Sequence, residues 1–428
     1  MILYMFRDWA RLNRSQWWSR EALIRIQERK FSEIANYAYA KVPFYRRLYD
    51  SSRVDPSEIN YGMIGRLPFV TRRNLNETSV QDRTAAGVDV SKCRPYGTSG
   101  STGTPVTVLE DQNFAADQEI AHLRAYSAGG VRPWHKLCTV LWTAANVPPL
   151  SDKLGLWNTI EGNFHRRILS NDINDHIKVY SVWKPDVLVT TASYLKALLW
   201  FLEQNHADLS FKIIITTGEL LDEITRKDIS DNFRADVIDY YALTEVGIVS
   251  WECSAHCGYH INAESVLVEF IDDRGQVASG GNGRVYVTSL KRMVTPIIRY
   301  FTGDIATQSD DECPCGRGLP LMKNIQGRTV DFVLTSDDRY LSPYTVITRV
   351  RGIDGVENFK LTQQDDLSID VQFRTRSIET GTIIRNLHNL FTELFGAVPA
   401  NIELVNEIEG EKGPKFRPVE SHRALGAH

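Results

Sequence analysis

Short runs of consecutive apolar residues, separated by segments with helical periodicity, occupy the middle of the chain and most restrict its fold. The apolar runs lie at residues 137–142, 187–191 and 211–216, and the helical segments at 113–128 and 194–205. Continuous apolar runs of this length are typical of strands that are buried on both faces, and their alternation with helices favours a layered sheet. We therefore predict an α/β fold for this part of the chain.

Two regions with other patterns flank this central part. Residues 16–50 carry Trp, Leu, Ile, Phe and Tyr at helical spacing, which predicts a helical N-terminal region. Near the other end, an alternating strand at 366–374, an amphipathic helix at 378–395 and a strand at 401–405 predict a small α+β unit. We expect a large N-terminal domain of residues 1–327 and a small C-terminal domain of residues 328–428.

Composition excludes several classes of protein. With 428 residues, 43% of them hydrophobic and 24% charged, the chain matches an ordinary globular protein. A net charge of −4 provides no basic surface for nucleic acid or for an anionic membrane. The apolar start is interrupted by Arg7 and Asp8, and no apolar run approaches the roughly 18 residues of a membrane span. A cytoplasmic location is expected.

Residues 96–105, Tyr-Gly-Thr-Ser-Gly-Ser-Thr-Gly-Thr-Pro, form a segment of small, hydroxylated and turn-forming residues. Glycines allow the backbone to approach an anion closely, and hydroxyl and N–H groups donate hydrogen bonds to phosphate oxygens. The segment is not a Walker A motif, because Gly103 is followed by Thr104 and the segment contains no lysine. It indicates a phosphate-binding loop, and a flexible Ser/Gly linker is the alternative when the loop is considered alone.

Further motifs follow this loop in a fixed order. They are Leu-Thr-Glu at 243–245, Ile-Arg-Tyr-Phe-Thr-Gly-Asp at 298–304, Cys-Pro-Cys-Gly-Arg at 313–317, Gly-Arg at 327–328 and Lys-Phe-Arg at 415–417. In these motifs the chain resembles the AMP-forming adenylating superfamily, and within it the phenylacetate–CoA ligase family and its relatives in capsular polysaccharide clusters. The resemblance covers most of the chain. It implies a large ATP- and acid-binding domain followed by a small, mobile C-terminal domain.

The resemblance also implies an activity. Enzymes of this superfamily use ATP and Mg²⁺ to convert a carboxylic acid, in some members an aromatic one, to an acyl-adenylate, and they release pyrophosphate. The acyl group then passes to a thiol, by default that of CoA. Transfer to an amine such as an amino sugar, and adenylyl transfer to a hydroxyl, are alternatives. A nucleotide-binding scaffold without activity is the non-enzyme alternative, and the retention of Glu245, Asp304, Arg328 and Lys415 argues against it.

Residue roles carry over from the motifs. The resemblance assigns the outgoing phosphates to Thr98, Ser99, Gly100, Ser101, Thr102 and Gly103, and the nucleotide to Gly218, Glu219, Tyr241 and Arg328. Thr244 would bind the α-phosphate and Glu245 would hold Mg²⁺. The carboxylate of Asp304 would accept both ribose hydroxyls. Lys415 would bridge the acid and the α-phosphate as the bond forms, with Lys412 as a competitor.

Four of the six cysteines occur in two close pairs, Cys253 with Cys257 and Cys313 with Cys315. Paired reduced cysteines in a cytosolic protein usually bind metal, and four thiolates would form a closed, structural zinc site. His260 competes with Cys257 as the fourth ligand. Reduced thiols near a turn are the alternative to a metal site.

Overall fold

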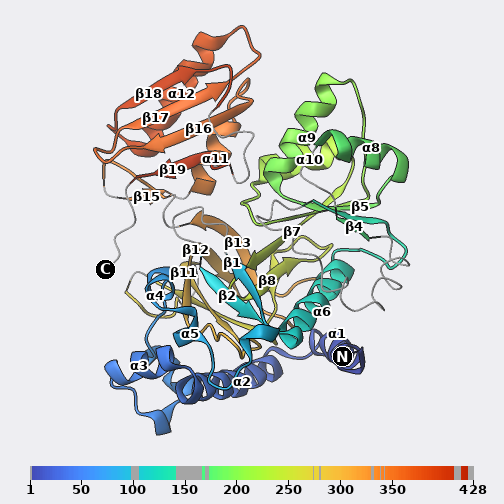
Figure 1. Ribbon diagram of the computed structural model, residues 1–428. Coiled ribbons are helices and arrows are strands. Elements are labelled where there is room, and N and C mark those ends of the chain that lie inside the picture. The colour runs from blue at the N-terminus through green and yellow to red at the C-terminus, as the bar shows by residue number, and fades with distance from the viewer. Residues whose placement is uncertain are drawn as a thin grey trace.

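The computed structural model describes residues 2–97, 106–140, 166–168, 173–272, 274–278, 281–328, 332–337, 339–341, 343–408 and 416–422. Figure 1 shows a lower body that contains the N-terminal helices and part of the main sheet, with two lobes above it. One lobe contains α8 (Ile173–Trp183), α9 (Ala192–Gln204) and α10 (Glu223–Phe233) with strands β4 (Arg166–Ile168) and β5 (Val187–Thr190) of the main sheet, and the other contains the C-terminal elements from β15 (Tyr340–Leu341) onward. The predicted mixed α/β fold is confirmed.

Helices form the first part of the chain. They are α1 (Ile2–Ser15), α2 (Arg20–Lys41), α3 (Pro43–Ser51), α4 (Arg72–Glu77) and α5 (Val80–Arg83), with short 3-10 turns at Pro56–Glu58, Tyr61–Arg66 and Val90–Lys92. The Ser19 side chain accepts a hydrogen bond from the Ala22 N–H, which caps the start of α2. Pro43 stands in the first turn of α3, where a missing N–H is tolerated. Phe31, Ile34 and Ala38 of α2 are buried against the main sheet.

Within the described residues, the main sheet has eleven strands in the order β10-β11-β12-β13-β9-β8-β7-β6-β5-β3-β4. Its strands are β3 (Leu137–Thr139), β4 (Arg166–Ile168), β5 (Val187–Thr190), β6 (Ile213–Thr217), β7 (Asp236–Leu243), β8 (Gly247–Glu252), β9 (Tyr259–Ile261), β10 (Val266–Ile271), β11 (Gly281–Ser289), β12 (Tyr300–Ser309) and β13 (Leu321–Arg328). From β4 to β7 neighbouring strands are parallel, and from β7 to β10 they are antiparallel. The change of direction occurs at β7.

Helices α6 (Gln112–Ala128), α8 (Ile173–Trp183), α9 (Ala192–Gln204) and α10 (Glu223–Phe233) belong to the parallel half of the fold. In that half β5 is buried along its whole length, as the continuous apolar pattern predicts. Leu195, Leu198 and Ile229 from the helices pack with Leu188 and Ile214 of the strands in one buried cluster.

The C-terminal part builds its own sheet and core. Its strands β16 (Asn358–Gln363), β17 (Ile369–Arg374), β18 (Ala400–Leu404) and β19 (Val419–Ser421) pair in the order β18-β17-β16-β19. Helices α11 (Pro343–Arg351) and α12 (Thr380–Phe395) and the hairpin of β14 (Val333–Leu334) and β15 (Tyr340–Leu341) complete it. Leu387, Phe391 and Phe395 of α12 are buried, so the amphipathic pattern lies over this small sheet.

Two features differ from the sequence-based expectation. Helix α1 precedes the helical region expected from residue 16, and its buried residues Met5 and Leu12 pack against Ala116 and Ile120 of α6. The helix was not predicted because Arg7 and Asp8 interrupt the apolar start of the chain. The seven-residue step from Met5 to Leu12 is nevertheless typical of helical periodicity. The antiparallel half of the main sheet was likewise not predicted from the apolar runs.

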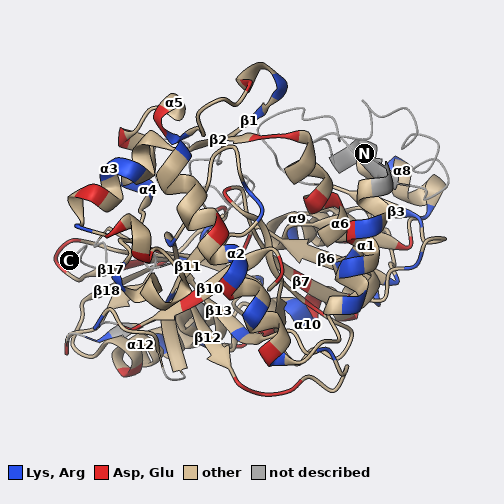
Figure 2. Cartoon of the chain, turned by 90° about the horizontal axis from the view of Figure 1, so that it is seen from below, with Lys and Arg blue, Asp and Glu red and all other residues tan. Residues whose placement is uncertain are grey.

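Figure 2 colours the positions of Lys and Arg and of Asp and Glu along the chain, and positions of both signs are spread over many elements, including helices α1, α2 and α10. This distribution agrees with the small net charge of −4. Among the described helices, none is both long and apolar enough to cross a membrane.

Candidate active site and metal centre

A cavity of about 1410 Å³ lies between the main sheet and the C-terminal part. Gly218, Glu219, Tyr241 and Asp304, all predicted to bind nucleotide, line it from the main-sheet side. Arg351 and Arg417 line it from the C-terminal side. The structure therefore brings together four predicted residues that are far apart in sequence.

Parallel strands place two of these residues at one edge of the sheet. Gly218 follows β6, Tyr241 lies on β7, and the pairing of Thr217 with Tyr240 puts the ends of the two strands side by side. Ligands of α/β proteins bind where the carboxyl ends of parallel strands meet. Gly218 has a φ of +80°, a conformation that favours glycine, and it turns the chain at this edge.

A hydrogen bond joins two of the predicted nucleotide residues. The Tyr241 hydroxyl donates to Oδ2 of Asp304, and both side chains are largely buried. The backbone N–H of Asp304 donates to the Thr302 hydroxyl at 3.0 Å, which fixes the turn before the carboxylate. Asp304 on β12 lies opposite Arg328 on β13, so the backbone of this fifth predicted residue is also adjacent.

Glu245 and Thr244 occupy the turn between β7 and β8, where Thr244 is exposed and Glu245 is buried. The Tyr300 hydroxyl donates to Oε1 of Glu245 at 3.0 Å and orients the carboxylate. Burial and the neighbouring Glu245 charge raise the pKa of Tyr300, which therefore stays protonated as a donor. Tyr300 was not singled out from the sequence, although it lies inside the motif at 298–304.

Glu219 has a partner that the sequence did not predict. Its carboxylate accepts hydrogen bonds from the N–H and the hydroxyl of Ser193, both at 2.7 Å, in the first turn of α9. A carboxylate at a helix N-terminus is also favoured by the helix dipole. Glu219 therefore connects the β6 edge to α9 in addition to lining the cavity.

A buried polar network lies behind the nucleotide edge. Asp239 accepts hydrogen bonds from the Thr216 hydroxyl at 2.5 Å and from the Tyr259 hydroxyl at 2.7 Å. Glu252 accepts from the Asp239 N–H at 2.7 Å and pairs with Arg226 at 2.9 Å. These bonds connect strands β6, β7, β8 and β9 with α10, and they hold the strand that carries Tyr241.

Several predicted site residues lie outside the described part of the chain. They are Thr98, Ser99, Gly100, Ser101, Thr102, Gly103 and Lys415, together with the side chain of Arg328. Strands β1 (Arg94–Gly97) and β2 (Thr107–Glu110) pair on either side of the predicted phosphate loop. A hydrogen bond of 3.2 Å from the Leu109 N–H to the Thr295 hydroxyl attaches this hairpin near the motif at 298–304.

A second candidate site consists of cysteine and histidine. The ligand atoms of Cys253, His260, Cys313 and Cys315 all lie within 4.8 Å of one another. The sulfurs of Cys253 and Cys313 are 3.7 Å apart, and the Cys315 sulfur is 3.3 Å from Nε2 of His260. Zinc–sulfur bonds of about 2.3 Å at tetrahedral angles place two thiolates about 3.8 Å apart. The donor set and its spacing fit a tetrahedral zinc ion.

Cys257 does not belong to this cluster, which corrects the sequence-based ligand set. Its side chain is exposed and its sulfur contacts the Ala255 carbonyl at 3.2 Å. The chain turns at 254–258, and His260 on β9 then points its ring toward Cys315. Burial and the charge of Arg317 lower the pKa of His260 to about 4, so the imidazole is neutral at pH 7, the form that binds metal.

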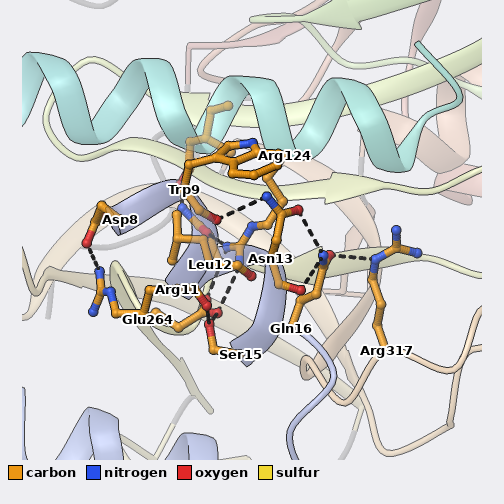
Figure 3. A network of polar contacts seen from close by, with 12 residues as sticks. Asp8, Trp9, Arg11, Leu12, Asn13, Ser15, Gln16, Arg124, Glu264 and Arg317 are labelled. Atoms are coloured by element: carbon orange, nitrogen blue, oxygen red, sulfur yellow. Dashed lines mark hydrogen bonds and ion pairs between the residues drawn. The ribbon is translucent and has the colours of Figure 1, made fainter. Parts of the chain in front are cut away.

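The cysteine loop is attached to the N-terminal helices. The Arg317 guanidinium donates to Oε1 of Gln16 at 2.8 Å, and the Gly318 N–H donates to the Gln16 carbonyl at 2.9 Å. Figure 3 shows this contact beside the buried ion pair of Arg124 with Glu264, which also accepts a hydrogen bond from Ser15. The turn between α1 and α2 is thus fixed from two sides.

Gly318→Ala is expected to lower the melting temperature. A Cβ atom at Gly318 would lie 1.8 Å from the Trp18 carbonyl oxygen, so the cysteine loop or the turn must move. Overpacking of this kind costs about 1–3 kcal/mol. Differential scanning fluorimetry measures the loss. The matched control is Gly381→Ala, where a Cβ meets nothing within 4 Å; equal melting temperatures for both variants would contradict the contact.

Several known enzymes have amino-acid sequences similar to that of this chain. No protein-family model matches the chain. The phenylacetate–coenzyme A ligase of Thermus thermophilus is 28% identical over 327 residues, which cover 74% of this chain and 72% of the relative. The indoleacetate–lysine synthetase of Pseudomonas savastanoi is 24% identical over 221 residues, covering 50% of this chain and 53% of the relative.

A solved structure extends the similarity to nearly the whole fold. The 2-hydroxyisobutyryl-CoA ligase, in a post-adenylation state with a bound acyl-AMP, superposes with a TM-score of 0.76 at 19% identity and covers 91% of this chain and 88% of its own. In sequence and in fold, the chain is similar to enzymes of the AMP-forming adenylating superfamily. The resemblance to its phenylacetate–CoA ligase family is confirmed, and the protein is an AMP-forming ligase.

The same ligase has been solved in more than one conformational state. The TM-score of the superposition with this chain differs between these states. In the thioesterification state, with acyl-AMP and CoA bound, the TM-score is 0.64 with 94% of this chain covered. The fold of this chain therefore superposes better on the post-adenylation state of that ligase than on its thioesterification state.

Proposed function

We propose that this enzyme activates a carboxylic acid with ATP and Mg²⁺ as an acyl-adenylate and then transfers the acyl group to the thiol of CoA. The observation that carries the proposal is the joint position of Tyr241, Asp304, Gly218 and Glu219 around one cavity. The similarity to phenylacetate–coenzyme A ligase supports both the acid and the CoA, and it favours an aromatic acid.

Two displacements account for the reaction. An oxygen of the carboxylate attacks the α-phosphorus of ATP, a new P–O bond forms, and the bond to the bridging oxygen breaks as pyrophosphate leaves. The sulfur of CoA then attacks the acyl carbonyl, the C–O bond to AMP breaks, and the thiol proton is released. The first step gathers negative charge on oxygens around phosphorus, so positioned donors and cations accelerate it.

The chain's own residues would serve this chemistry as follows. Asp304, held by Tyr241, would accept the ribose hydroxyls, and Thr244 would donate to the α-phosphate from the turn after β7. The loop at residues 98–103 would donate to the phosphates that leave. Lys415 would place an ammonium between the acid and the α-phosphate, where negative charge develops only as the bond forms.

Glu245 fits a magnesium ligand. It is a buried carboxylate beside the predicted α-phosphate donor Thr244, and the Tyr300 hydrogen bond fixes its orientation. Carboxylates together with phosphate oxygens are the usual ligands of Mg²⁺ in nucleotide sites. When bound, the ion would neutralise charge on the phosphates of ATP.

We also propose a structural zinc ion held by Cys253, His260, Cys313 and Cys315. All four positions of a tetrahedral ion would be filled by protein ligands, which leaves no place for a reacting water. The ion would join β8 and β9 to the loop between β12 and β13.

The domain division of residues 1–327 and 328–428 is likewise proposed, with the C-terminal domain as the mobile part. It is supported by the end of the main sheet at Arg328 and by the separate sheet and buried core that follow. Leu220, a partly buried residue of the first part, packs against that core.

An amine acceptor is the second candidate. It is favoured by the similarity to indoleacetate–lysine synthetase, whose name pairs an acid with an amine. In this version the first displacement is unchanged, and an amine nitrogen replaces the sulfur of CoA in the second.

The function is tested by pyrophosphate release from the purified protein with ATP and Mg²⁺ across aromatic, aliphatic and amino acids, with and without CoA. Release that depends on the acid and rises with CoA supports the thiol ligase. Release that is stimulated by an amine and ignores CoA supports the second candidate. No release with any acid, although ATP binds, would reject acid activation for that panel.

Asp304→Ala is expected to raise the KM for ATP by at least about tenfold, since hydrogen bonds to a charged group contribute roughly 1.5–3 kcal/mol each. Steady-state kinetics with saturating acid measure the change. Asp208→Ala is the control, because Asp208 is 71% exposed and pairs only with a surface arginine in the described contacts. Equal KM values for the two variants would remove Asp304 from the ribose site.

A further inference from the structure

An ion pair crosses between the two parts of the enzyme. Arg351, at the end of α11 in the C-terminal part, contacts Oδ2 of Asp222 and the hydroxyl of Thr225 at the start of α10. The Arg351 and Asp222 side chains are only 8% and 4% exposed. Asp222 also accepts the Thr225 N–H at 3.0 Å, so it caps α10 and is held in place by its own helix.

The surroundings keep the Asp222 carboxylate charged. Burial favours the neutral carboxyl, but the Arg351 charge and the Thr225 hydrogen bonds outweigh it and lower the pKa of Asp222. Lys196 of α9 is near both residues, and burial with the Arg351 charge lowers its pKa to about 7. A buried charge that loses its partner is costly, so removing either residue destabilises this arrangement of the two parts.

Other contacts across the boundary are weaker. Arg376 pairs with Glu203 at 3.0 Å, but these side chains are 61% and 55% exposed, and exposed pairs contribute little. Leu220, which packs against the C-terminal core, is itself only partly buried. Among the described ion pairs across this boundary, Arg351 with Asp222 is the buried one.

The arrangement that this pair accompanies can be compared with several arrangements of one solved relative. Against the same 2-hydroxyisobutyryl-CoA ligase, the TM-score is 0.76 for the post-adenylation state and 0.64 for the thioesterification state. Because the relative is the same protein, the difference comes from its arrangement and not from its fold. A contact present in one arrangement can bias the balance between the two.

We propose that Arg351 and Asp222 are positioning residues for acid activation, because their ion pair holds the C-terminal part over the nucleotide cavity in an arrangement near the post-adenylation state of the relative. This inference rests on the proposed function. The pair carries out no chemistry and acts through the residues that the C-terminal part brings to the cavity. It separates when the enzyme adopts the thiol-transfer arrangement.

The two half-reactions test this role separately. Arg351→Gln removes the positive charge of the pair. Asp222→Asn removes the negative charge and keeps a side chain that caps helices well. We expect each variant to slow acid-dependent adenylate formation about tenfold, while thiol transfer from supplied acyl-AMP is unchanged or faster. Arg351→Lys should recover part of the loss. Equal slowing of both half-reactions, or of neither, would overturn the proposal.

The matched control is Arg349→Gln. Arg349 lies on the same helix α11 and is also ion-paired, at 2.7 Å, but its partner Glu393 belongs to the C-terminal part. The proposal expects this variant to behave as the wild type in both half-reactions. A tenfold loss of adenylate formation here would show that α11 tolerates no arginine loss and would count against a specific role of the pair.

A distance measurement that needs no turnover completes the test. Spin labels at Val182→Cys and Ile378→Cys, which are 86% and 99% exposed, report the separation of the two parts in a Cys93→Ser, Cys257→Ser background. We expect one dominant distance with ATP and Mg²⁺, and a second, longer or broader population after Arg351→Gln. Identical distributions would overturn the proposal. If the wild-type enzyme activates no acid, the proposed function is rejected. The distance measurement can still be interpreted in that case, because it needs no turnover.

Discussion

Replacing Lys415 with alanine is expected to lower acid-dependent pyrophosphate release by at least about 100-fold, while ATP binds within about twofold of the wild type. The reason is that a lysine between the acid and the α-phosphate stabilises charge that develops only as the new bond forms. Such a contact contributes to the transition state and little to the bound substrates. Pyrophosphate release at saturating acid and ATP, with calorimetric ATP binding, measures both quantities.

Lys412→Ala is the control for this prediction, because Lys412 is in the same short segment and carries the same charge. A fall of similar size for Lys412→Ala, with activity kept by Lys415→Ala, would exchange the roles of the two lysines. If Lys415→Ala loses ATP affinity and the rate of pyrophosphate release to the same extent, Lys415 binds the phosphates of ATP already in the ground state.

Cys313→Ser is expected to release about one equivalent of zinc and to lower the melting temperature by about 10 °C or more. Structural zinc contributes directly to folding free energy, and loss of one of four ligands weakens the site strongly. The effect should extend to the turn between α1 and α2, since Arg317 and Gly318 bind Gln16 there. Elemental analysis of purified protein and thermal unfolding measure the two quantities.

Cys257→Ser provides the matched control, because Cys257 is an exposed thiol outside the cluster. It should keep both the zinc content and the melting temperature of the wild type. Loss of zinc from both Cys313→Ser and Cys257→Ser would restore the four-cysteine set expected from the sequence and reject the role of His260.

The elements that the sequence predicts best are those with local causes. The buried runs became β5 and β6, and the helical patterns became α6 and α9 within one or two residues. An amphipathic helix and two strands of the C-terminal part were predicted in the same way. Helix α2 ends at Lys41, just before Pro43, and Pro43 then stands in the first turn of the next helix, α3.

The site was harder to predict because it depends on pairing between distant segments. The motif order indicated Tyr241 and Asp304, but only the fold shows that their side chains share a hydrogen bond. Likewise, spacing along the chain favoured Cys257 as a ligand, whereas the path of β9 brings His260 to the other cysteines. The partnership of Glu219 with Ser193 depends on α9 lying next to β6 and has no signal in sequence.

The most direct test of acid activation follows an oxygen atom. The enzyme is incubated with ATP, Mg²⁺, CoA and an acid that the pyrophosphate assay selects, with the carboxylate labelled with ¹⁸O. Because a carboxylate oxygen attacks the α-phosphorus, the account predicts that the AMP produced carries one labelled oxygen, detected by mass spectrometry. AMP without label, formed at the same rate as product, would contradict an acyl-adenylate intermediate.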